Sequence, residues 1–139
     1  MKAVVEWDGE VAFSGTTETG HKLVMDGPAE YGGRNLGPRP TELVLVGMGG
    51  CTSFDVVHVL KKGRADVRGC VAHIDADRAP EDPKVFTRIH VHFVVTGRDL
   101  KESIVERAIR LSADKYCSVS IMLGKTAEIS HSFEIIDVE

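Results

Sequence analysis

Cysteine is the residue type in this chain whose placement points most directly to chemistry. There are three, Cys51, Cys70 and Cys117, and an odd number in 139 residues argues against a structural disulfide framework. In a reducing compartment, isolated cysteines are either small buried apolar residues or reactive thiols. By residue type alone, burial is the commoner role for each. Any meeting of Cys51 with Cys117 must be tertiary, because they are far apart in the sequence.

Histidines offer a second kind of chemistry. His90 and His92 stand two residues apart, so they share one strand face, as pairs of metal ligands can, and His73 falls on a neighbouring strand. No acid stands at a fixed spacing from them, and a solvated strand face explains them more simply. His58 lies two helical turns, about 10 Å, beyond Cys51, which is too far for a direct hydrogen bond.

The segment 41–62 is predicted to form the helix that positions Cys51. Its middle is apolar nearly all round, which favours a buried central helix. Gly47, Gly49 and Gly50 each cost about 1 kcal/mol relative to alanine in a helix interior. Three interpretations remain open: close packing of a second backbone, open space in front of the Cys51 thiol, or a break in the helix. Residues typical of helix ends flank the segment, namely Pro40, Thr41, Glu42, Lys61, Lys62 and Gly63.

The other elements are predicted to be strands and a second helix. A hairpin over 3–13 turns at Asp8-Gly9, and a third short strand covers 21–26. Asp99 is the expected N-cap of the second helix, with Glu102 completing a capping box. The remaining ranges are a Gly- and Pro-rich loop at 26–40, strands at 67–78 and 85–97 with a hairpin loop at 79–83, the second helix at 99–114, and a last strand at 126–138.

Length and composition indicate one domain over residues 1–139. Hydrophobic residues make up 42% of the chain and charged residues 27%, which is the ordinary globular balance. Strands, a helix, strands, a helix and a strand predict an α+β fold with antiparallel sheets around a buried central helix. One small chain can hardly cover a helix that is apolar nearly all round, as the helix over 41–62 is, and we therefore expect a dimer.

Charge and hydropathy exclude several classes of partner. The net charge of −4 gives no basic excess that would attract nucleic acid or an anionic membrane. No apolar run approaches the roughly 20 residues that span a bilayer. The N-terminus has no long apolar stretch before its first acid, so no secretory signal is expected. The expectation is a cytoplasmic protein.

Two motifs together resemble those of one protein family. Residues 37–43 and 47–57, around Cys51, are similar to the central helix of the OsmC/Ohr family, the osmotically induced and organic-hydroperoxide-resistance proteins. Residues 115–120, around Cys117, resemble the second cysteine motif of that family. The order of elements is similar over nearly the whole chain, and the subgroup it resembles is the less characterised OsmC-like proteins.

The resemblance implies a cofactor-free thiol peroxidase that acts on organic hydroperoxides. Cys51 would be the peroxidatic cysteine, which becomes a sulfenic acid. Cys117 would be the resolving cysteine, which forms a Cys51–Cys117 disulfide that an external dithiol reduces. The resemblance also implies an intertwined homodimer with active sites at its interface, and an arginine–glutamate pair beside the thiolate.

The arginine–glutamate pair is where the chain departs from the family pattern. Thr41 stands at the usual glutamate position, and Glu42, one residue on, is turned by about 100° around the helix. The family arginine comes from the first hairpin, yet residues 5–25 contain no arginine. Arg34 and Arg39 are either its substitutes or solvated loop charges.

Two other functions therefore stay open. Without a nearby cation, a thiol in an apolar helix has little reactivity. The chain would then be a non-enzymatic protein of the same fold that binds a small apolar ligand near residues 47–51. The other alternative is a metal site on the strand face of His90 and His92.

Overall fold

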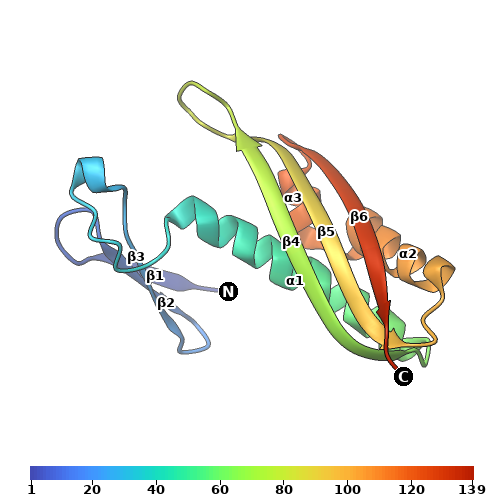
Figure 1. Cartoon of the computed structure of the whole chain (residues 1–139). Helices are drawn as coiled ribbons and strands as arrows, with labels where there is room; N and C mark the ends of the chain where they lie inside the picture. The colour runs from blue at the N-terminus through green and yellow to red at the C-terminus, as the bar shows by residue number, and fades with distance from the viewer. The chain divides into compact units, whose positions relative to one another are not determined.

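Two three-stranded sheets and one long helix make up most of the chain (Figure 1). The structure is a computed structural model that describes residues 1–139. It divides into two compact units, Met1–Val46 and Gly47–Glu139. The division falls within the helix α1 (Pro40–Lys62), so the first turns of α1 belong to the first unit and the remainder to the second.

The first unit is an antiparallel meander. It contains β1 (Ala3–Trp7), β2 (Phe13–Thr17) and β3 (Lys22–Met25) in that order. The predicted hairpin and third strand are confirmed, but the second strand begins at Phe13, where the prediction ended it. The loop that follows includes one 3-10 turn, η1 (Ala29–Tyr31). Buried Asp26 holds this loop, because its carboxylate accepts hydrogen bonds from the backbone N–H groups of Gly27, Arg34 and Leu36.

The second unit is a mixed sheet with helices on one face (Figure 1). β4 (Asp66–Arg78) and β5 (Phe86–Arg98) pair antiparallel, as predicted, but β6 (Glu128–Asp137) pairs parallel to β5. The expectation of antiparallel pairing throughout is therefore wrong for β6. Parallel pairing is possible because the long connection from β5 to β6 is a helical crossover. It consists of α2 (Glu102–Leu111), the π-helical turn η2 (Ser112–Tyr116) and α3 (Ser118–Leu123).

The start of α2 also differs from the prediction. Lys101 occupies the N-cap position and makes no side-chain cap hydrogen bond. Asp99 instead adopts a positive φ of 53°, and its backbone N–H donates to Asp137 Oδ1 at 3.0 Å. A carboxylate from β6 thus binds the turn, which no pattern local to residues 99–102 could indicate.

Helix α1 runs without a break through its three glycines. A Cβ atom added at Gly49 would lie 3.0 Å from Ile74 Cδ1, so this glycine allows close packing against a side chain of β4. Gly47 and Gly50 face open space. Of the three interpretations, a break is excluded, and no second backbone approaches the glycines, because the neighbour of Gly49 is the Ile74 side chain. Open space remains for Gly47 and Gly50.

The predicted burial of α1 holds for one stripe of the helix. Within the second unit this stripe repeats every four residues as Met48, Thr52, Val56 and Leu60, all completely buried. Phe54, on another side of the helix, is 69% exposed. The expectation that no segment is apolar enough to span a bilayer is wrong, since α1 meets that criterion with a mean hydropathy of 1.7. The core helix of a soluble protein can meet the same criterion, and here the buried stripe packs within the unit.

Candidate functional site

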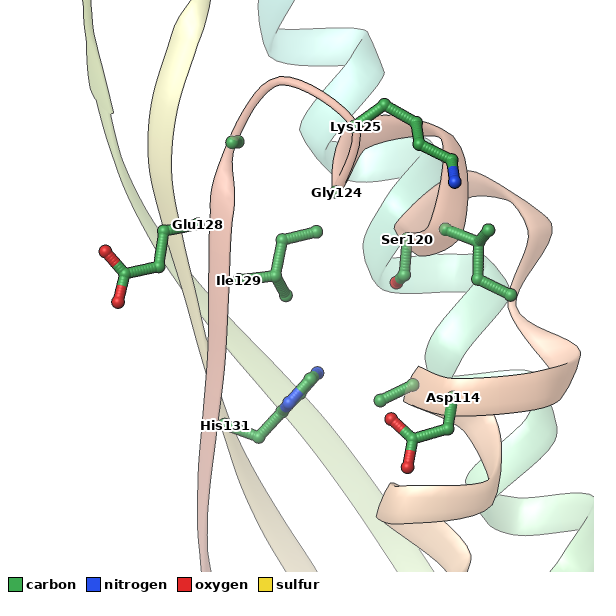
Figure 2. Close-up of a pocket in the computed structure, with 10 residues that line it drawn as sticks. Asp114, Ser120, Gly124, Lys125, Glu128, Ile129 and His131 are labelled. Atoms are coloured by element: carbon green, nitrogen blue, oxygen red, sulfur yellow. The ribbon is translucent and has the colours of Figure 1, made fainter.

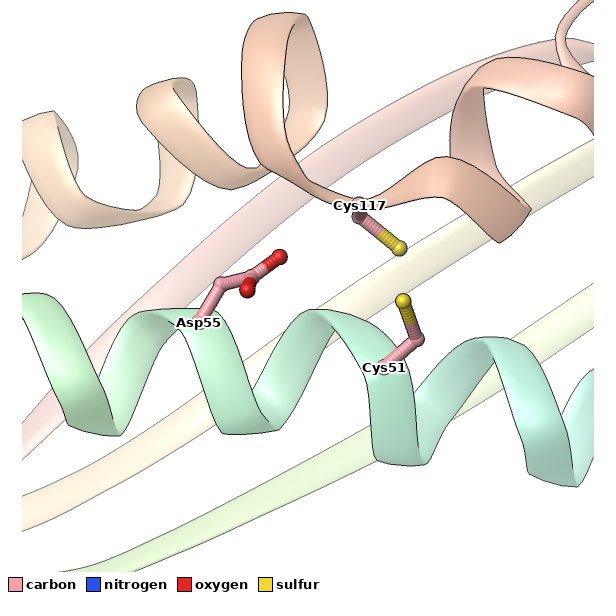
Figure 3. Close-up of side chains that lie close together, drawn as sticks. All are labelled: Cys51, Asp55 and Cys117. Atoms are coloured by element: carbon pink, nitrogen blue, oxygen red, sulfur yellow. The ribbon is translucent and has the colours of Figure 1, made fainter.

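Two of the three cysteine thiols lie together in the second unit (Figure 3). Cys51 projects from α1, and Cys117 is the N-cap residue of α3. The two Sγ atoms and a carboxylate oxygen of Asp55 all lie within 4.8 Å of one another. Cys117 is completely buried, whereas Cys51 and Asp55 are half-buried, and both thiols are free. The tertiary meeting that the sequence left open is therefore present.

Local structure explains why these three residues converge. Cys51 and Asp55 are four residues apart on α1, so they lie on the same side of the helix. The π-helical turn η2 widens the backbone just before Cys117, whose N–H donates to the Ser112 carbonyl at 2.8 Å. Single π-helical turns of this kind often occur at functional sites. Asp55 was not among the predicted site residues, although its i+4 spacing from Cys51 is apparent in the sequence.

A buried chain of hydroxyl groups orients the Asp55 carboxylate. Ser112 Oγ donates to Asp55 Oδ2 at 3.0 Å and lies 2.8 Å from Thr52 Oγ1. Thr52 and Ser112 are both completely buried. Because a buried hydroxyl without a partner costs about 1–3 kcal/mol, these bonds join α1 to η2 and leave Asp55 few orientations.

The surroundings of Cys117 favour its neutral form. Burial raises the pKa of the Cys117 thiol, hydrogen bonding by Ser120 lowers it, and the neighbouring Cys51 raises it further. The backbone N–H of Ser120 donates to Cys117 Sγ at 3.4 Å. Cys117 is thus a sheltered thiol with one fixed donor, while Cys51 adjoins exposed Gly50 and is the more accessible of the pair.

Cys70 does not belong to this cluster. It lies on β4, half-buried, where burial raises the pKa of its thiol and a hydrogen bond with Ser53 lowers it. It lines a different cavity of about 430 Å³ with residues of α1 that include Phe54 and His58. The rings of Phe54 and His58 stack with centroids 5.8 Å apart, so His58 packs on its own helix.

The predicted activating residues Arg34, Arg39 and Glu42 all lie in the first unit. Arg39 and Glu42 form a local pair at the start of α1: the Arg39 backbone N–H donates to Glu42 Oε1 at 2.8 Å, and the two side chains approach within 4.0 Å. Arg34 contributes its backbone N–H to Asp26. The charged group that the second unit places beside the thiols is the anion Asp55, and any role of the other three at Cys51 stays a prediction.

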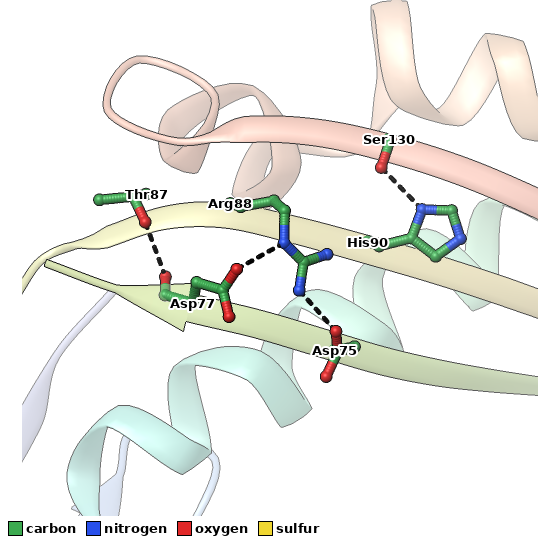
Figure 4. A network of polar contacts seen from close by, with 6 residues as sticks. All are labelled: Asp75, Asp77, Thr87, Arg88, His90 and Ser130. Carbon is green, nitrogen blue, oxygen red and sulfur yellow. Dashed lines mark hydrogen bonds and ion pairs between the residues drawn. The ribbon is translucent and has the colours of Figure 1, made fainter.

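The histidines on the sheet take part in a polar ladder. His90 contacts the hydroxyls of Ser130 at 2.6 Å and Ser132 at 2.8 Å, and His92 contacts Ser132 at 2.7 Å. On the same face, Arg88 bridges Asp75 and Asp77 (Figure 4). The predicted neighbour of His92 is confirmed, since His73 is its partner in the register of β4 and β5. These contacts favour the polar-face interpretation over a histidine metal site.

A cavity of about 470 Å³ lies between α3 and β6 and is lined in part by polar side chains, among them Asp114, Ser120 and His131 (Figure 2). His131 Nε2 is buried and forms no hydrogen bond, whereas the Ser120 side chain interacts with the Cys117 thiol. Burial lowers the pKa of His131, the nearby His90 lowers it further and Asp114 raises it. Buried polar atoms normally have partners, so His131 Nε2 makes this cavity a candidate binding site. No pattern along the sequence predicted this cavity.

Comparison with known proteins places the chain in a family. A model of the family described as OsmC-like protein matches residues 32–132. Protein YhfA of Escherichia coli (strain K12) is 46% identical over 136 residues, which cover 98% of both chains. A hypothetical protein from Aquifex aeolicus VF5 is 30% identical, with a TM-score of 0.87 and coverage of 99% of this chain and 97% of the other.

A more distant structure shares the fold alone. It is the organic hydroperoxide resistance protein OhrB of Bacillus subtilis, 18% identical, with a TM-score of 0.65 over 96% of each chain. The family model covers more than half of the chain, the relatives align along almost all of it, and the fold agrees. The chain described above therefore belongs to the OsmC-like protein family.

Proposed function

We propose that this protein is a cysteine-based peroxidase that reduces organic hydroperoxides. The observation that carries the proposal is the pair of free thiols, Cys51 and Cys117, brought within 4.8 Å from separate elements. Two thiols this close can exchange between a dithiol and a disulfide with only a small movement. A fold shared with a protein named for organic hydroperoxide resistance adds support.

Exposure assigns the two roles. Cys51 is half-buried whereas Cys117 is completely buried, so a hydroperoxide can reach the Cys51 sulfur more easily. Cys117 is completely buried, and burial raises the pKa of its thiol, which favours the less reactive protonated form. Cys51 is accordingly the peroxidatic residue and Cys117 the resolving one.

The chemistry balances with one external reductant. The Cys51 thiolate attacks the distal oxygen of the hydroperoxide, the O–O bond breaks, and the alkoxide takes a proton and leaves as an alcohol. Cys117 sulfur then attacks the Cys51 sulfenic acid, the disulfide forms, and water leaves with the Cys117 proton. An external dithiol reduces the disulfide and restores both thiols. No cofactor takes part in this scheme.

A homodimer is the proposed working form, and the cell cytoplasm, a reducing compartment, its proposed location. Large apolar residues in both units are exposed in the single chain, including Trp7 at 66% and Phe54 at 69%. A second copy would cover them, because apolar surface of this extent usually marks an association site. In such an assembly Arg34 or Arg39, with Glu42, would supply the cation that the second unit does not itself place beside Cys51.

The test is turnover of cumene hydroperoxide with dithiothreitol as reductant, followed by peptide mapping without reduction. We expect a Cys51–Cys117 disulfide with Cys70 free, and loss of turnover in Cys51→Ser. Cys70→Ser is the matched control and should retain full turnover. If the thiols stay reduced after a molar equivalent of hydroperoxide, or if Cys51→Ser remains active, the proposal is wrong.

The cavity between α3 and β6 favours a second candidate, a small-ligand-binding protein. The unpartnered His131 Nε2 supports it, and this atom indicates a ligand with a polar group rather than the purely apolar one expected near residues 47–51. Native mass spectrometry of the purified protein should then show a retained small molecule that is lost in His131→Phe. A ligand-free spectrum combined with robust peroxidase activity would eliminate this candidate.

A further inference from the structure

We infer that the reduced Cys51–Cys117 pair, together with Asp55, is a binding site for a single Zn²⁺ ion. The inference concerns the same thiols as the proposed peroxidase, but it needs no peroxide chemistry and stands or falls separately. Its basis is a set of three ligand-type side chains that converge from α1 and from the N-cap of α3.

The ligand distances are close to those that zinc requires. In a tetrahedral site, Zn–S bonds of about 2.3 Å and Zn–O bonds of about 2.0–2.2 Å place the ligand atoms roughly 3.4–3.8 Å apart. The two Sγ atoms and the Asp55 oxygen lie within 4.8 Å of one another. Side-chain rotations that move these atoms by about 1 Å therefore complete three corners of a tetrahedron.

The chemistry of the donors selects the metal. Two thiolates and one carboxylate form an S₂O set, which suits Zn²⁺ better than Mg²⁺ or Ca²⁺, because those harder ions prefer all-oxygen sites. Three neighbouring groups that are anionic when deprotonated repel one another, and a divalent cation removes that repulsion. Three protein ligands leave the fourth corner for water, as in zinc sites that stay open to solvent.

The groups behind the ligands are already in place. Ser112 Oγ donates to Asp55 Oδ2, which leaves the other carboxylate oxygen available, and Thr52 Oγ1 contacts Ser112 Oγ in turn. The Ser120 backbone N–H donates to Cys117 Sγ at 3.4 Å, as such groups do for metal-bound thiolates. Two of the three ligands are thus oriented before a metal arrives, which reduces the entropy lost on binding.

Zinc binding and the disulfide exclude each other, because both need the same two sulfurs. If the proposed peroxidase activity holds, a hydroperoxide oxidises the zinc-bound pair: the two thiolates lose two electrons and form the S–S bond. The hydroperoxide takes those electrons with two protons and becomes an alcohol and water, and Zn²⁺ is released. This release rests on the proposed function, whereas the binding itself does not.

The test is titration of the reduced, metal-free protein with Co²⁺ under anaerobic conditions. We expect thiolate-to-cobalt charge-transfer absorption that saturates at one equivalent per chain and disappears when Zn²⁺ displaces the cobalt. Cys51→Ser and Cys117→Ser should each lose most of this absorption. Asp55→Asn should weaken binding by at least about tenfold, since even second-shell changes cost roughly 10–100-fold. Controls with Cys70→Ser and with Glu106→Gln, an exposed acid on α2, should bind as the unchanged protein does.

A second measurement uses the unsubstituted protein, so its result does not depend on whether any variant folds. Zn²⁺ should slow alkylation of Cys51 and Cys117 by iodoacetamide and leave Cys70 unaffected, as mass spectrometry of the peptides would report. Absence of charge-transfer absorption, or equal protection of all three cysteines, would overturn the site. If the metal-free protein turns over hydroperoxide but does not bind Co²⁺, only the zinc site is refuted. If the protein binds Co²⁺ tightly but does not turn over hydroperoxide, only the peroxidase proposal is refuted.

Discussion

Each of the two units contains a three-stranded sheet, but apolar side chains are largely exposed on the first sheet and largely buried on the second. In the first unit, Val4, Val5 and Trp7 of β1 are 59%, 60% and 66% exposed. In the second, Ile89 and Val91 of β5 are completely buried, as are Phe93 and Val95 beyond them. Helices cover one face of the second sheet (Figure 1). The second unit therefore has its own core.

The buried apolar residues of the second unit bear on its stability, whereas the exposed ones of the first unit bear on assembly with another surface. A segment of 46 residues is too short to bury much apolar surface by itself. Its sheet exposes apolar side chains that a second copy would cover in the proposed homodimer. The thiol pair, by contrast, lies in the unit with the complete core, where packing can hold reacting groups in place.

The largest effect should come from the core of the second unit. Phe93→Ala leaves a cavity in the middle of β5 and should lower the free energy of unfolding by about 3–5 kcal/mol. Leu23→Ala, at a 48% exposed site of β3, is the matched substitution in the first unit. Urea unfolding measures both. If Leu23→Ala lowers the free energy of unfolding as much as Phe93→Ala does, but only at high protein concentration, a second copy of the chain buries Leu23.

The next effect should appear at the exposed sheet of the first unit. Trp7 is the only tryptophan and is 66% exposed in the single chain. If a second copy covers it, Trp7→Asp should weaken the dimer by at least about 2 kcal/mol, or roughly thirtyfold in Kd. Sedimentation velocity over a dilution series measures this. If the unsubstituted protein is monomeric at every concentration, the proposed homodimer is wrong.

A smaller effect is expected in the hydroxyl chain behind the thiols. Ser112→Ala removes the donor to Asp55 and leaves the buried Thr52 hydroxyl without its side-chain partner, which should cost about 1–2 kcal/mol. The double variant Thr52→Val/Ser112→Ala should recover part of that loss, because both partners are then apolar. Unfolding of the two single variants and the double variant tests this coupling, and strictly additive losses would refute it.

The smallest effect concerns pH. Burial lowers the pKa of His131 in the folded chain below its usual 6.5, so the unfolded chain binds a proton more readily as the pH falls through 6.5. Stability should therefore decrease from neutral pH toward the folded pKa, by at most about 1.4 kcal/mol per pH unit. His131→Gln should flatten this dependence. Denaturation midpoints at several pH values between neutral and mildly acidic compare the two proteins, and parallel curves would show that His131 is not responsible.

Patterns along the chain predicted most of the elements. The alternation of residues 85–97 indicated β5, and the apolar run of 41–62 indicated α1, because burial imposes a period of two on strands and selects apolar residues in core helices. Errors arose where a distant residue competes with a local signal. Asp99 has the sequence of an N-cap, yet its backbone binds Asp137 on β6. The parallel pairing of β6 likewise depends on a crossover rather than on any strand pattern.

Only part of the candidate site was predicted, because its residues come together through tertiary packing that local sequence patterns do not describe. Cysteine motifs drew attention to Cys51 and Cys117, but sequence spacing contained nothing about their distance. Asp55 was visible only as a neighbour of Cys51 on the helix, and its meaning comes from Ser112, which approaches from the crossover.

By itself the sequence determined the composition of the chain, its helix and strand periods and the presence of two thiols in characteristic contexts, since these depend on residue type and local spacing. Only the tertiary structure decided that the thiols meet, that an anion accompanies them and that buried polar atoms line a cavity between α3 and β6. The physical reason is that such groups come from elements far apart in the chain, and their distances are set by how the elements pack and not by the order of residues.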